Sequence, residues 1–262
     1  MAGNSTTPRQ TVTARVLALL AAFDDEHRSL GLTELAHRAE MPLATAHRLV
    51  AELVRGAVLV RRADATYVVG RRMWDLGRLA PVETGLRHAA SPFLHDLYGA
   101  TLATVHLAVR DGCSVLYVDR VSGHASVPVV SQVGSRLPMH ATGVGKVLLA
   151  YAPEPVRTEV LGNLTRVTPY TVTQPGRLLE QIRRVLSDGY ATTSEEMSLG
   201  ACSVAVPVRQ PGGEVVAALG IVVAGLQRDK ARLVSALRVA AHGIGRSLPA
   251  LPSSGSSDLP RY

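Results

Sequence analysis

The chain has 262 residues, of which 47% are hydrophobic and 19% charged, and its net charge is +7. This composition is typical of a globular protein and excludes a disordered or fibrous one, while the length provides for one large domain or two ordinary ones. Only Lys146 and Lys230 are lysines, so arginine carries almost all of the positive charge, and its guanidinium group binds phosphate bidentately.

Cysteine content and apolar runs narrow the class further. The two cysteines, Cys113 and Cys202, are too few for a disulfide framework, and no Cys or His spacing indicates a zinc site. The longest apolar run, residues 215–226, is shorter than the ~20 residues that a membrane-spanning helix needs. We therefore expect a cytoplasmic protein that has no metal, no membrane segment and no cofactor.

The first predicted elements are those of a winged helix-turn-helix domain, placed at residues 10–72 behind a disordered tail at residues 1–9. Three helices and a hairpin are expected in this order: Thr11 to about Asp24, 34–38 with Thr33 as N-cap, Pro42 to about Arg55 with Pro42 in the first helical position, and the strands 58–61 and 66–69. This order matches a helix-turn-helix followed by a wing.

The third helix is the predicted DNA-reading element. Its core stripe recurs at intervals of three and four residues, at Ala46, Leu49, Val50 and Leu53. Between residues 41 and 72 there are six arginines and two acidic residues. Eight residues are predicted to contact double-stranded DNA: Thr33, Thr45, His47, Arg48, Arg55, Arg61, Arg62 and Arg71. The alternative is a solvated basic face on a small protein-interaction domain.

A second pattern follows a predicted linker helix at residues 73–86. Helices are expected at 87–98, 141–152, 154–161, 175–188 and 229–247, and strands at 104–109, 114–118, 127–133, 202–209 and 214–223. Antiparallel strand pairs with helices on their faces indicate an α+β sensor domain at residues 87–250 rather than a doubly wound nucleotide fold. A flexible tail is expected at residues 251–262.

One stretch of this second domain has the look of a phosphate loop. Gly143-Val144-Gly145-Lys146 lacks the earlier glycine of a P-loop, where His140 stands, and Val147 replaces the Ser or Thr that would hold magnesium. Leu148 breaks the dinucleotide-binding pattern. The stretch therefore does not predict a nucleotide site.

Four stretches, at residues 41–59, 104–121, 133–150 and 189–225, resemble the IclR family of bacterial transcriptional regulators. The resemblance covers about residues 12–248. It implies a winged helix-turn-helix joined by a linker helix to a C-terminal α/β, GAF-like effector-binding domain. It also implies a regulator that binds operator DNA and a small-molecule effector as a homodimer or as a dimer-of-dimers tetramer. We expect this regulator to be nucleoid-associated and to be a repressor rather than an activator, although the sequence does not fix the sign of the response.

The resemblance also places an effector pocket. Its lining falls on Val129, Leu137, Gly143, Val144, Thr193, Cys202, Gly220 and Val222, with Ser194 and Ser203 as further polar anchors. Relatives that bind small hydroxy- or keto-acids tend to have an aspartate near Thr193 and serines at Gly220 and Val222, and this chain has one residue fewer near Gly200. The apolar lining predicts a hydrophobic or aromatic carboxylate.

Three alternatives accompany these interpretations. Gly143 and Gly145 either let backbone N–H groups approach a ligand or only allow the helix to pack on the sheet. Lys146 is expected at the surface or at an interface. A Cys/His enzyme is a second alternative, with Cys113, Cys202, His106 and His140 as the candidate residues. The sequence shows no signature of a catalytic base or of an oxyanion site beside them, so we expect no enzyme. A metabolite-sensing adaptor without DNA binding would leave the arginine-rich winged helix unused.

Overall fold

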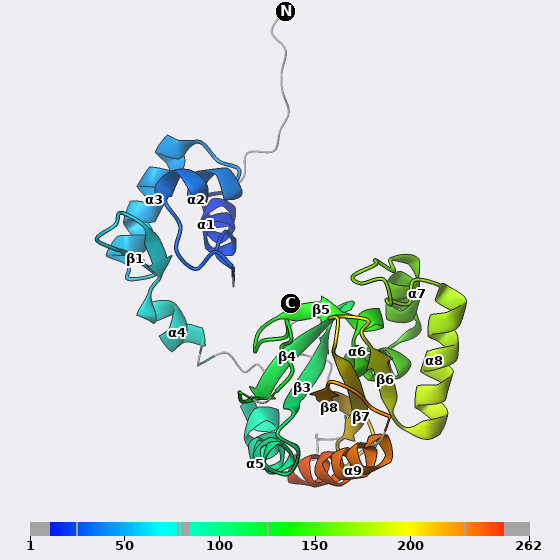
Figure 1. Ribbon diagram of the computed structural model, residues 1–262. Helices are drawn as coiled ribbons and strands as arrows, with labels where there is room; N and C mark the ends of the chain where they lie inside the picture. Colours follow the sequence, from blue (N-terminus) through cyan, green and yellow to red (C-terminus); the bar gives the residue numbers. More distant parts are fainter. Residues whose placement is uncertain are drawn as a thin grey trace, which may run out of the picture. The chain divides into compact units, whose positions relative to one another are not determined.

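The computed structural model of the chain describes residues 11–24, 26–77, 79, 84–124, 126–227 and 229–248. The chain divides into two compact units between residues 82 and 83 (Figure 1). The tails expected at residues 1–9 and 251–262 lie outside the described residues, the last of which is residue 248.

The N-terminal unit contains the expected helices and hairpin (Figure 1). Its elements are α1 (Val12–Ala21), α2 (Leu32–Arg38), α3 (Leu43–Arg55), β1 (Leu59–Arg61), β2 (Tyr67–Val69) and α4 (Arg71–Gly77). Strands β1 and β2 pair antiparallel. Leu19, Leu35 and Leu49 bring the first three helices into one core, and an isolated bridge ties Leu30 to Tyr67 on the hairpin.

The helix ends in this unit differ from the prediction for local reasons. Helix α2 begins at Leu32 after Gly31, so Thr33 lies inside the helix and caps nothing. Pro42 is the N-cap of α3 rather than its first residue. Helix α1 ends at Ala21 because Asp24 belongs to the loop, where its carboxylate accepts the N–H groups of residues 26 and 27 and pairs with Arg38 at 2.5 Å.

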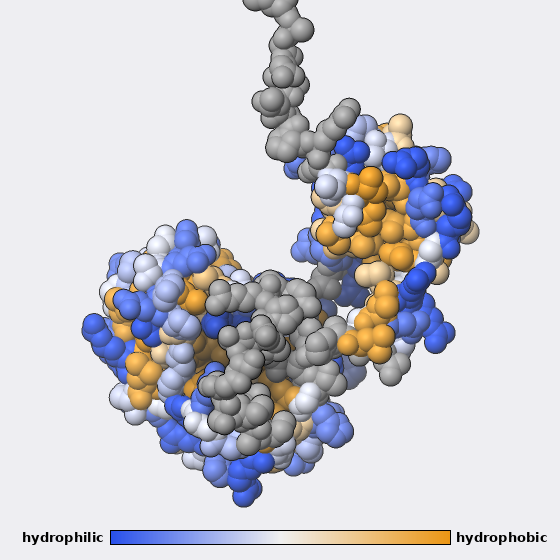
Figure 2. All heavy atoms as spheres, turned by 180° about the vertical axis from the view of Figure 1, so that it is seen from behind, coloured by the Kyte–Doolittle hydropathy of each residue, from blue (hydrophilic) through white to orange (hydrophobic). Residues whose placement is uncertain are grey.

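The segment that leaves the N-terminal unit begins with α4. The linker helix predicted at residues 73–86 overlaps α4, but residues 78 and 80–83 lie outside the described residues. None of the residues of α4 is buried, and Trp74, Leu76 and Leu79 are exposed apolar side chains. Seen from behind, this unit presents a continuous apolar face with a polar rim (Figure 2).

The C-terminal unit is built on one antiparallel six-stranded sheet in the order β5-β4-β3-β8-β7-β6. Its strands are β3 (Thr104–Asp111), β4 (Ser114–Val121), β5 (Arg136–Pro138), β6 (Ala191–Ser194), β7 (Cys202–Arg209) and β8 (Val215–Val223). Its helices are α5 (Thr84–Thr101), α6 (Gly143–Ala150), α7 (Glu154–Gly162), α8 (Pro175–Asp188) and α9 (Lys230–Ser247), with a 3-10 turn at Met139–Ala141 before α6.

The sheet separates two hydrophobic cores, because successive side chains of a strand point to opposite faces. On β3, Leu107 packs beneath α5 and α9, whereas Ala108 belongs to the core beneath α6 and α8. On β8, Leu219 lies in the core beneath α5 and α9, and Ala218 lies in the core beneath α6 and α8. Figure 1 shows α5 and α9 on one side of the sheet, and α6, α7 and α8 on the other. This arrangement confirms the α+β architecture.

One predicted strand of the sheet was wrong, and two short strands were missed. Residues 127–133 form an irregular segment instead of a strand, because Pro128 has no N–H to donate to a ladder. The edge strands β5 and β6, with three and four residues, were not predicted. Helix α6 begins at Gly143 rather than at residue 141, since Thr142 is its N-cap and accepts the N–H of Gly145 at 3.1 Å.

Candidate functional site

The N-terminal unit presents α3 as an amphipathic helix. Ala46, Leu49, Val50 and Leu53 are buried as the periodicity predicted. His47 and Arg48 lie exposed on the opposite side, and within the described part of the chain neither forms an ion pair. Thr45 is half-buried. The free polar groups of α3 therefore project together from the helix that a helix-turn-helix inserts into the major groove.

The other residues predicted to contact DNA lie on other elements of the same unit or at the end of α3. Arg61 and Arg62 are exposed on the hairpin and Thr33 is exposed on α2. Two arginines already have acidic neighbours: Arg55 lies 2.9 Å from Glu52, and Arg71 lies 3.9 Å from Asp75. Exposed pairs of this kind are worth little, so a phosphate group can replace the carboxylate partner.

The C-terminal unit contains a cavity of about 50 Å³ on the face of the sheet that α6 covers. Strand register explains its floor. One row of facing residues runs across four strands as Thr104, Val222, Ser203 and Thr193, and the next row begins with His106, Gly220 and Ala205. Apart from Thr104, all of these residues line the cavity. The floor is therefore apolar in its middle, with polar side chains toward either side.

Glycines let α6 lie directly on this floor. A Cβ at Gly143 would stand 2.5 Å from Oγ of Ser203, and a Cβ at Gly220 would stand 2.8 Å from Cγ1 of Val144. A Cβ at Gly145 would meet the carbonyl oxygen of Met139 at 2.4 Å. The glycines thus have the packing role that the sequence left open, and the same close approach brings the first turn of α6 to the cavity, where Gly143 and Val144 form part of the lining.

Two hydrogen-bonded pairs supply most of the polarity of the lining. Oγ1 of Thr193 and Oγ of Ser203 are 2.6 Å apart. Oγ of Ser131 lies 2.8 Å from Nε2 of His106, whose ring meets the edge of Tyr117 with 5.0 Å between the ring centroids.

None of the lining residues carries a charge at neutral pH. Burial, together with the nearby charge of Arg120, lowers the pKa of His106 from 6.5 to about 3. Burial also raises the pKa of Tyr117 above its usual range, and a hydrogen bond with Thr142 opposes this only in part. No Asp, Glu, Lys or Arg contributes to the lining. An anionic group here must therefore be met by neutral donors, namely hydroxyls and the N–H groups of the first turn of α6.

The structure brings most of the predicted pocket residues together. Val129, Leu137, Gly143, Val144, Thr193, Gly220 and Val222 all line the cavity. Ser194 and Cys202 do not line it; they face each other across β6 and β7 at 3.5 Å and alternate with the lining pair Thr193 and Ser203. Cys202 was misplaced by one position, and a shift of one position along a strand moves a side chain to the other face of the sheet.

Several lining residues were missed by the sequence analysis. His106 and Tyr117 lie on strands, where period-two alternation places them on the same face as the predicted residues. Ser131 and Met197 come from irregular connections, where no periodic signal exists to find them.

Lys146 was expected at the surface or an interface, and the structure corrects this. Every residue of α6 is buried, and Lys146 is 1% exposed. Its Nζ lies 2.5 Å from Oε1 of Glu196, which is 7% exposed. A helix that lies between a sheet and α8 has no solvent-facing side, so a charged residue on it needs a buried partner.

The groups that suggested an enzyme are not arranged as a nucleophile and its base. Burial and the nearby Glu159 raise the pKa of the Cys113 thiol, which opposes formation of a thiolate. Nε2 of His140 is bonded to the carbonyl of Thr165 at 2.8 Å. Cys202 is buried beside Ser194.

Comparison with known proteins gives a consistent result along the chain. A model described as the IclR helix-turn-helix domain matches residues 12–62, and one described as the C-terminal part of the bacterial transcriptional regulator IclR matches residues 80–246. In the part of the chain that the structure describes, no helix combines the length and apolar character required to cross a membrane.

Similar proteins are regulators of transcription rather than enzymes. The HTH-type transcriptional regulator XynR of Escherichia coli (strain K12) is 29% identical over 224 residues, which are 84% of this chain and 89% of the relative. BhcR of Paracoccus denitrificans (strain Pd 1222) is 31% identical over 207 residues, 78% and 74% of the two chains. A solved IclR homolog from Microbacterium hydrocarbonoxydans, complexed with 4-hydroxybenzoate, is 35% identical with a TM-score of 0.86, covering 91% of this chain and 99% of its own.

Proposed function

Because this chain belongs to the IclR family of bacterial transcriptional regulators, it is a DNA-binding regulator, and we propose that a small aromatic carboxylate controls its affinity for operator DNA. The observation that carries this proposal is the uncharged cavity beneath the first turn of α6. Its apolar middle suits a ring, and its hydroxyls and helix N–H groups suit a carboxylate.

The ligand class is supported by the solved relative that holds 4-hydroxybenzoate. A cavity of about 50 Å³ is smaller than the ~150 Å³ in which an apolar engineered cavity holds benzene. An aromatic acid therefore binds a state in which the lining has moved apart. A ligand that distinguishes two arrangements of a protein shifts the equilibrium between them, which is the requirement for coupling to a second site.

For DNA, we propose that His47 and Arg48 contact bases or the adjacent phosphates. Arg61, Arg62 and Arg71 then contact the phosphate backbone near the wing, with Thr33, Thr45 and Arg55 adding contacts from α2 and α3. All of these residues lie on one unit, and all except the half-buried Thr45 are exposed, which supports the assignment. Phosphate contacts fix position, and base contacts select sequence.

One winged domain contacts too few bases for useful specificity, so we propose a homodimer, or a dimer of dimers, on a pseudo-palindromic operator. The proposed parts are the winged domain at residues 10–72, the linker at 73–86 and the effector domain at 87–250. Exposed Trp74, Leu76 and Leu79 supply an apolar surface for pairing. Light scattering should give at least twice the mass of one chain, and a strictly monomeric protein would contradict the proposal.

The proposed mode of regulation is repression that the effector relieves. The test is a titration of the protein against the DNA upstream of its own gene, over a range of salt concentrations. We expect specific binding that weakens with salt and is released by 4-hydroxybenzoate. Tighter binding with the ligand would make the protein an activator or corepressor-dependent regulator, and binding that ignores every aromatic acid tried would remove the effector proposal.

A further inference from the structure

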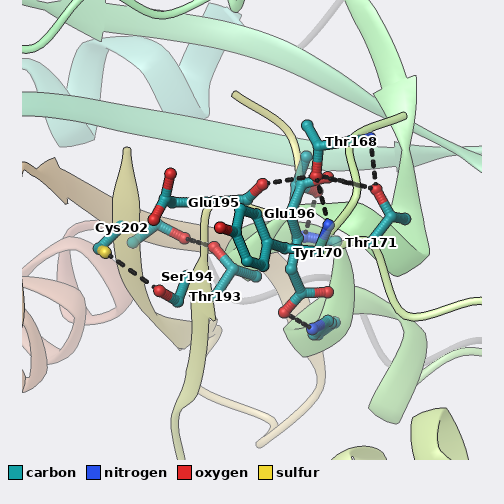
Figure 3. Close-up of polar contacts among 12 residues, drawn as sticks. Thr168, Tyr170, Thr171, Thr193, Ser194, Glu195, Glu196 and Cys202 are labelled. Atoms are coloured by element: carbon teal, nitrogen blue, oxygen red, sulfur yellow. Dashed lines mark hydrogen bonds and ion pairs between the residues drawn. The ribbon is translucent and has the colours of Figure 1, made fainter. Parts of the chain in front are cut away.

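A buried ion pair joins two segments that enclose the cavity. Lys146 stands on α6, less than one turn after the lining residue Val144. Its partner Glu196 is in the connection from β6 to β7, directly before the lining residue Met197. Nζ of Lys146 and Oε1 of Glu196 are 2.5 Å apart, and Figure 3 shows the Glu196 carboxylate making this contact.

The backbone of the same connection is held from a second side. Oγ1 of Thr168 donates to the carbonyl of Glu195 at 2.7 Å, and Oγ1 of Thr171 donates to the carbonyl of Glu196 at 2.8 Å (Figure 3). The loop that carries these threonines also begins with a hydrogen bond: the carbonyl oxygen of Thr165 is bonded to Nε2 of His140, which lies in the turn before α6. Glu195 and Glu196, at the start of the connection, are therefore held both by α6 and by the loop that carries the two threonines.

This ion pair is a poor source of stability. Oε2 of Glu196 is buried and has no hydrogen-bond partner among the described residues, which costs free energy. Burial also lowers the pKa of Lys146, although the charge of Glu196 opposes that change. A buried ion pair is often no more stabilising than two apolar side chains of similar volume. What the pair does supply is a fixed separation between α6 and the connection.

We propose that Lys146 and Glu196 are positioning residues of the cavity, which hold residues 195–201 over the first turn of α6 and thereby set ligand affinity. The inference rests on the proposed ligand-binding function of the cavity. Neither residue contacts the cavity itself. Their effect passes through Gly143 and Val144 on one side and through Met197 and Ser198 on the other.

The test replaces the pair by apolar residues in the full-length protein. In Lys146→Met/Glu196→Met we expect a melting temperature close to that of the wild type, since the two methionines fill similar volume. Amide hydrogen exchange of residues 195–201, measured without ligand, should become faster by about tenfold or more. Calorimetric affinity for 4-hydroxybenzoate should fall by about tenfold or more, because binding must then order the connection.

Two further variants separate positioning from general stability. Lys146→Arg keeps the ion pair and should retain slow exchange and ligand affinity. Glu180→Met/Arg184→Met removes an exposed pair on α8 and should change none of the three measurements. If the double methionine variant does not fold, Glu196→Gln takes its place: it removes the charge attraction but leaves Lys146 a neutral acceptor, so exchange and affinity should change in the same direction by a smaller factor.

Unchanged exchange and affinity in the folded variant would overturn the proposal, as would losses that Lys146→Arg shows equally. If wild-type protein binds no aromatic carboxylate, the proposed ligand fails. The exchange measurement still decides the positioning role in that case, because it requires no ligand.

Discussion

The imidazole of His106 lies beneath the cavity, bonded to Ser131 and against the edge of Tyr117. Its pKa is 6.5 in an ordinary setting and about 3 here, because burial disfavours the charged ring. Below pH 6.5, His106 becomes protonated in the unfolded chain, whereas in the folded chain it stays neutral down to about pH 3. The contribution of this group to stability is therefore complete above pH 6.5 and declines as the pH falls through that window.

Replacing His106 by glutamine should flatten this part of the pH dependence. At pH 5, compared with pH 7.5, wild-type protein should lose about 2 kcal/mol of unfolding free energy that His106→Gln does not lose. Denaturant unfolding at the two pH values measures the difference. Replacement of the exposed His47 by glutamine is the matched control, and it should show the same difference in unfolding free energy between the two pH values as the wild type. Equal slopes in wild type and His106→Gln would show that the histidine is not neutralised by burial.

On α3, the proposed DNA-reading helix, Arg48→Ala should weaken specific operator binding by about 1–3 kcal/mol, because the proposed contact of this exposed guanidinium with a base or phosphate is lost. Fluorescence anisotropy at fixed, moderate salt measures it. Arg184→Ala, an exposed arginine on α8, should leave affinity within error. An Arg48→Ala protein with wild-type affinity would mean that α3 does not read the operator.

Single residues also show where sequence reasoning ends. Alternation along β7 indicates that every second side chain shares a face, but it does not say which set faces the cavity. That choice depends on where the connection at residues 195–201 ends, and it puts Ser203 rather than Cys202 over the floor. Lys146 was misplaced because only the position of Glu196, fifty residues away, makes its burial tolerable.

Among the elements, α6 depends most visibly on close packing. Gly145→Ala places a Cβ against the backbone carbonyl of Met139, which cannot yield cheaply, so we expect about 1–3 kcal/mol of destabilisation. Gly176 is also helical, near the start of α8, but a Cβ there meets nothing within 4 Å. Gly176→Ala should be neutral or slightly stabilising. Thermal unfolding of the two variants decides, and equal stability would contradict the packing role of Gly145.

Long periodic elements were predictable, and short ones were not. Helix α8 has the predicted bounds, Pro175–Asp188, because its apolar stripe is clear and Gly189 ends it with a left-handed backbone. Strands β5 and β6 are too short to show alternation above chance. Residues 127–133 look like a strand because they are rich in valine, yet three of those valines serve as cavity lining or exposed surface rather than as strand core.

At the scale of the whole molecule, the proposed function requires both units of the chain. The resemblance was sufficient to predict the order of the units and the fold of each, since both cores follow from hydrophobic patterning. The state of the ligand site was not predictable, because its volume depends on irregular connections. The proposed control of DNA binding requires that ligand affinity differ between two arrangements of the protein.

Whether this cavity controls DNA binding is decided by operator affinity with and without 4-hydroxybenzoate, measured for wild type and for Val129→Trp. Val129 lines the cavity from an irregular segment, so a bulky residue there fills the space without entering a strand. We predict that the ligand changes wild-type operator affinity by about fivefold to a hundredfold, as expected for ~1–3 kcal/mol of coupling. In Val129→Trp the ligand response should disappear while ligand-free operator affinity stays the same. A full response in Val129→Trp, or none in wild type across a panel of aromatic carboxylates, would contradict the assignment of this cavity as the effector site.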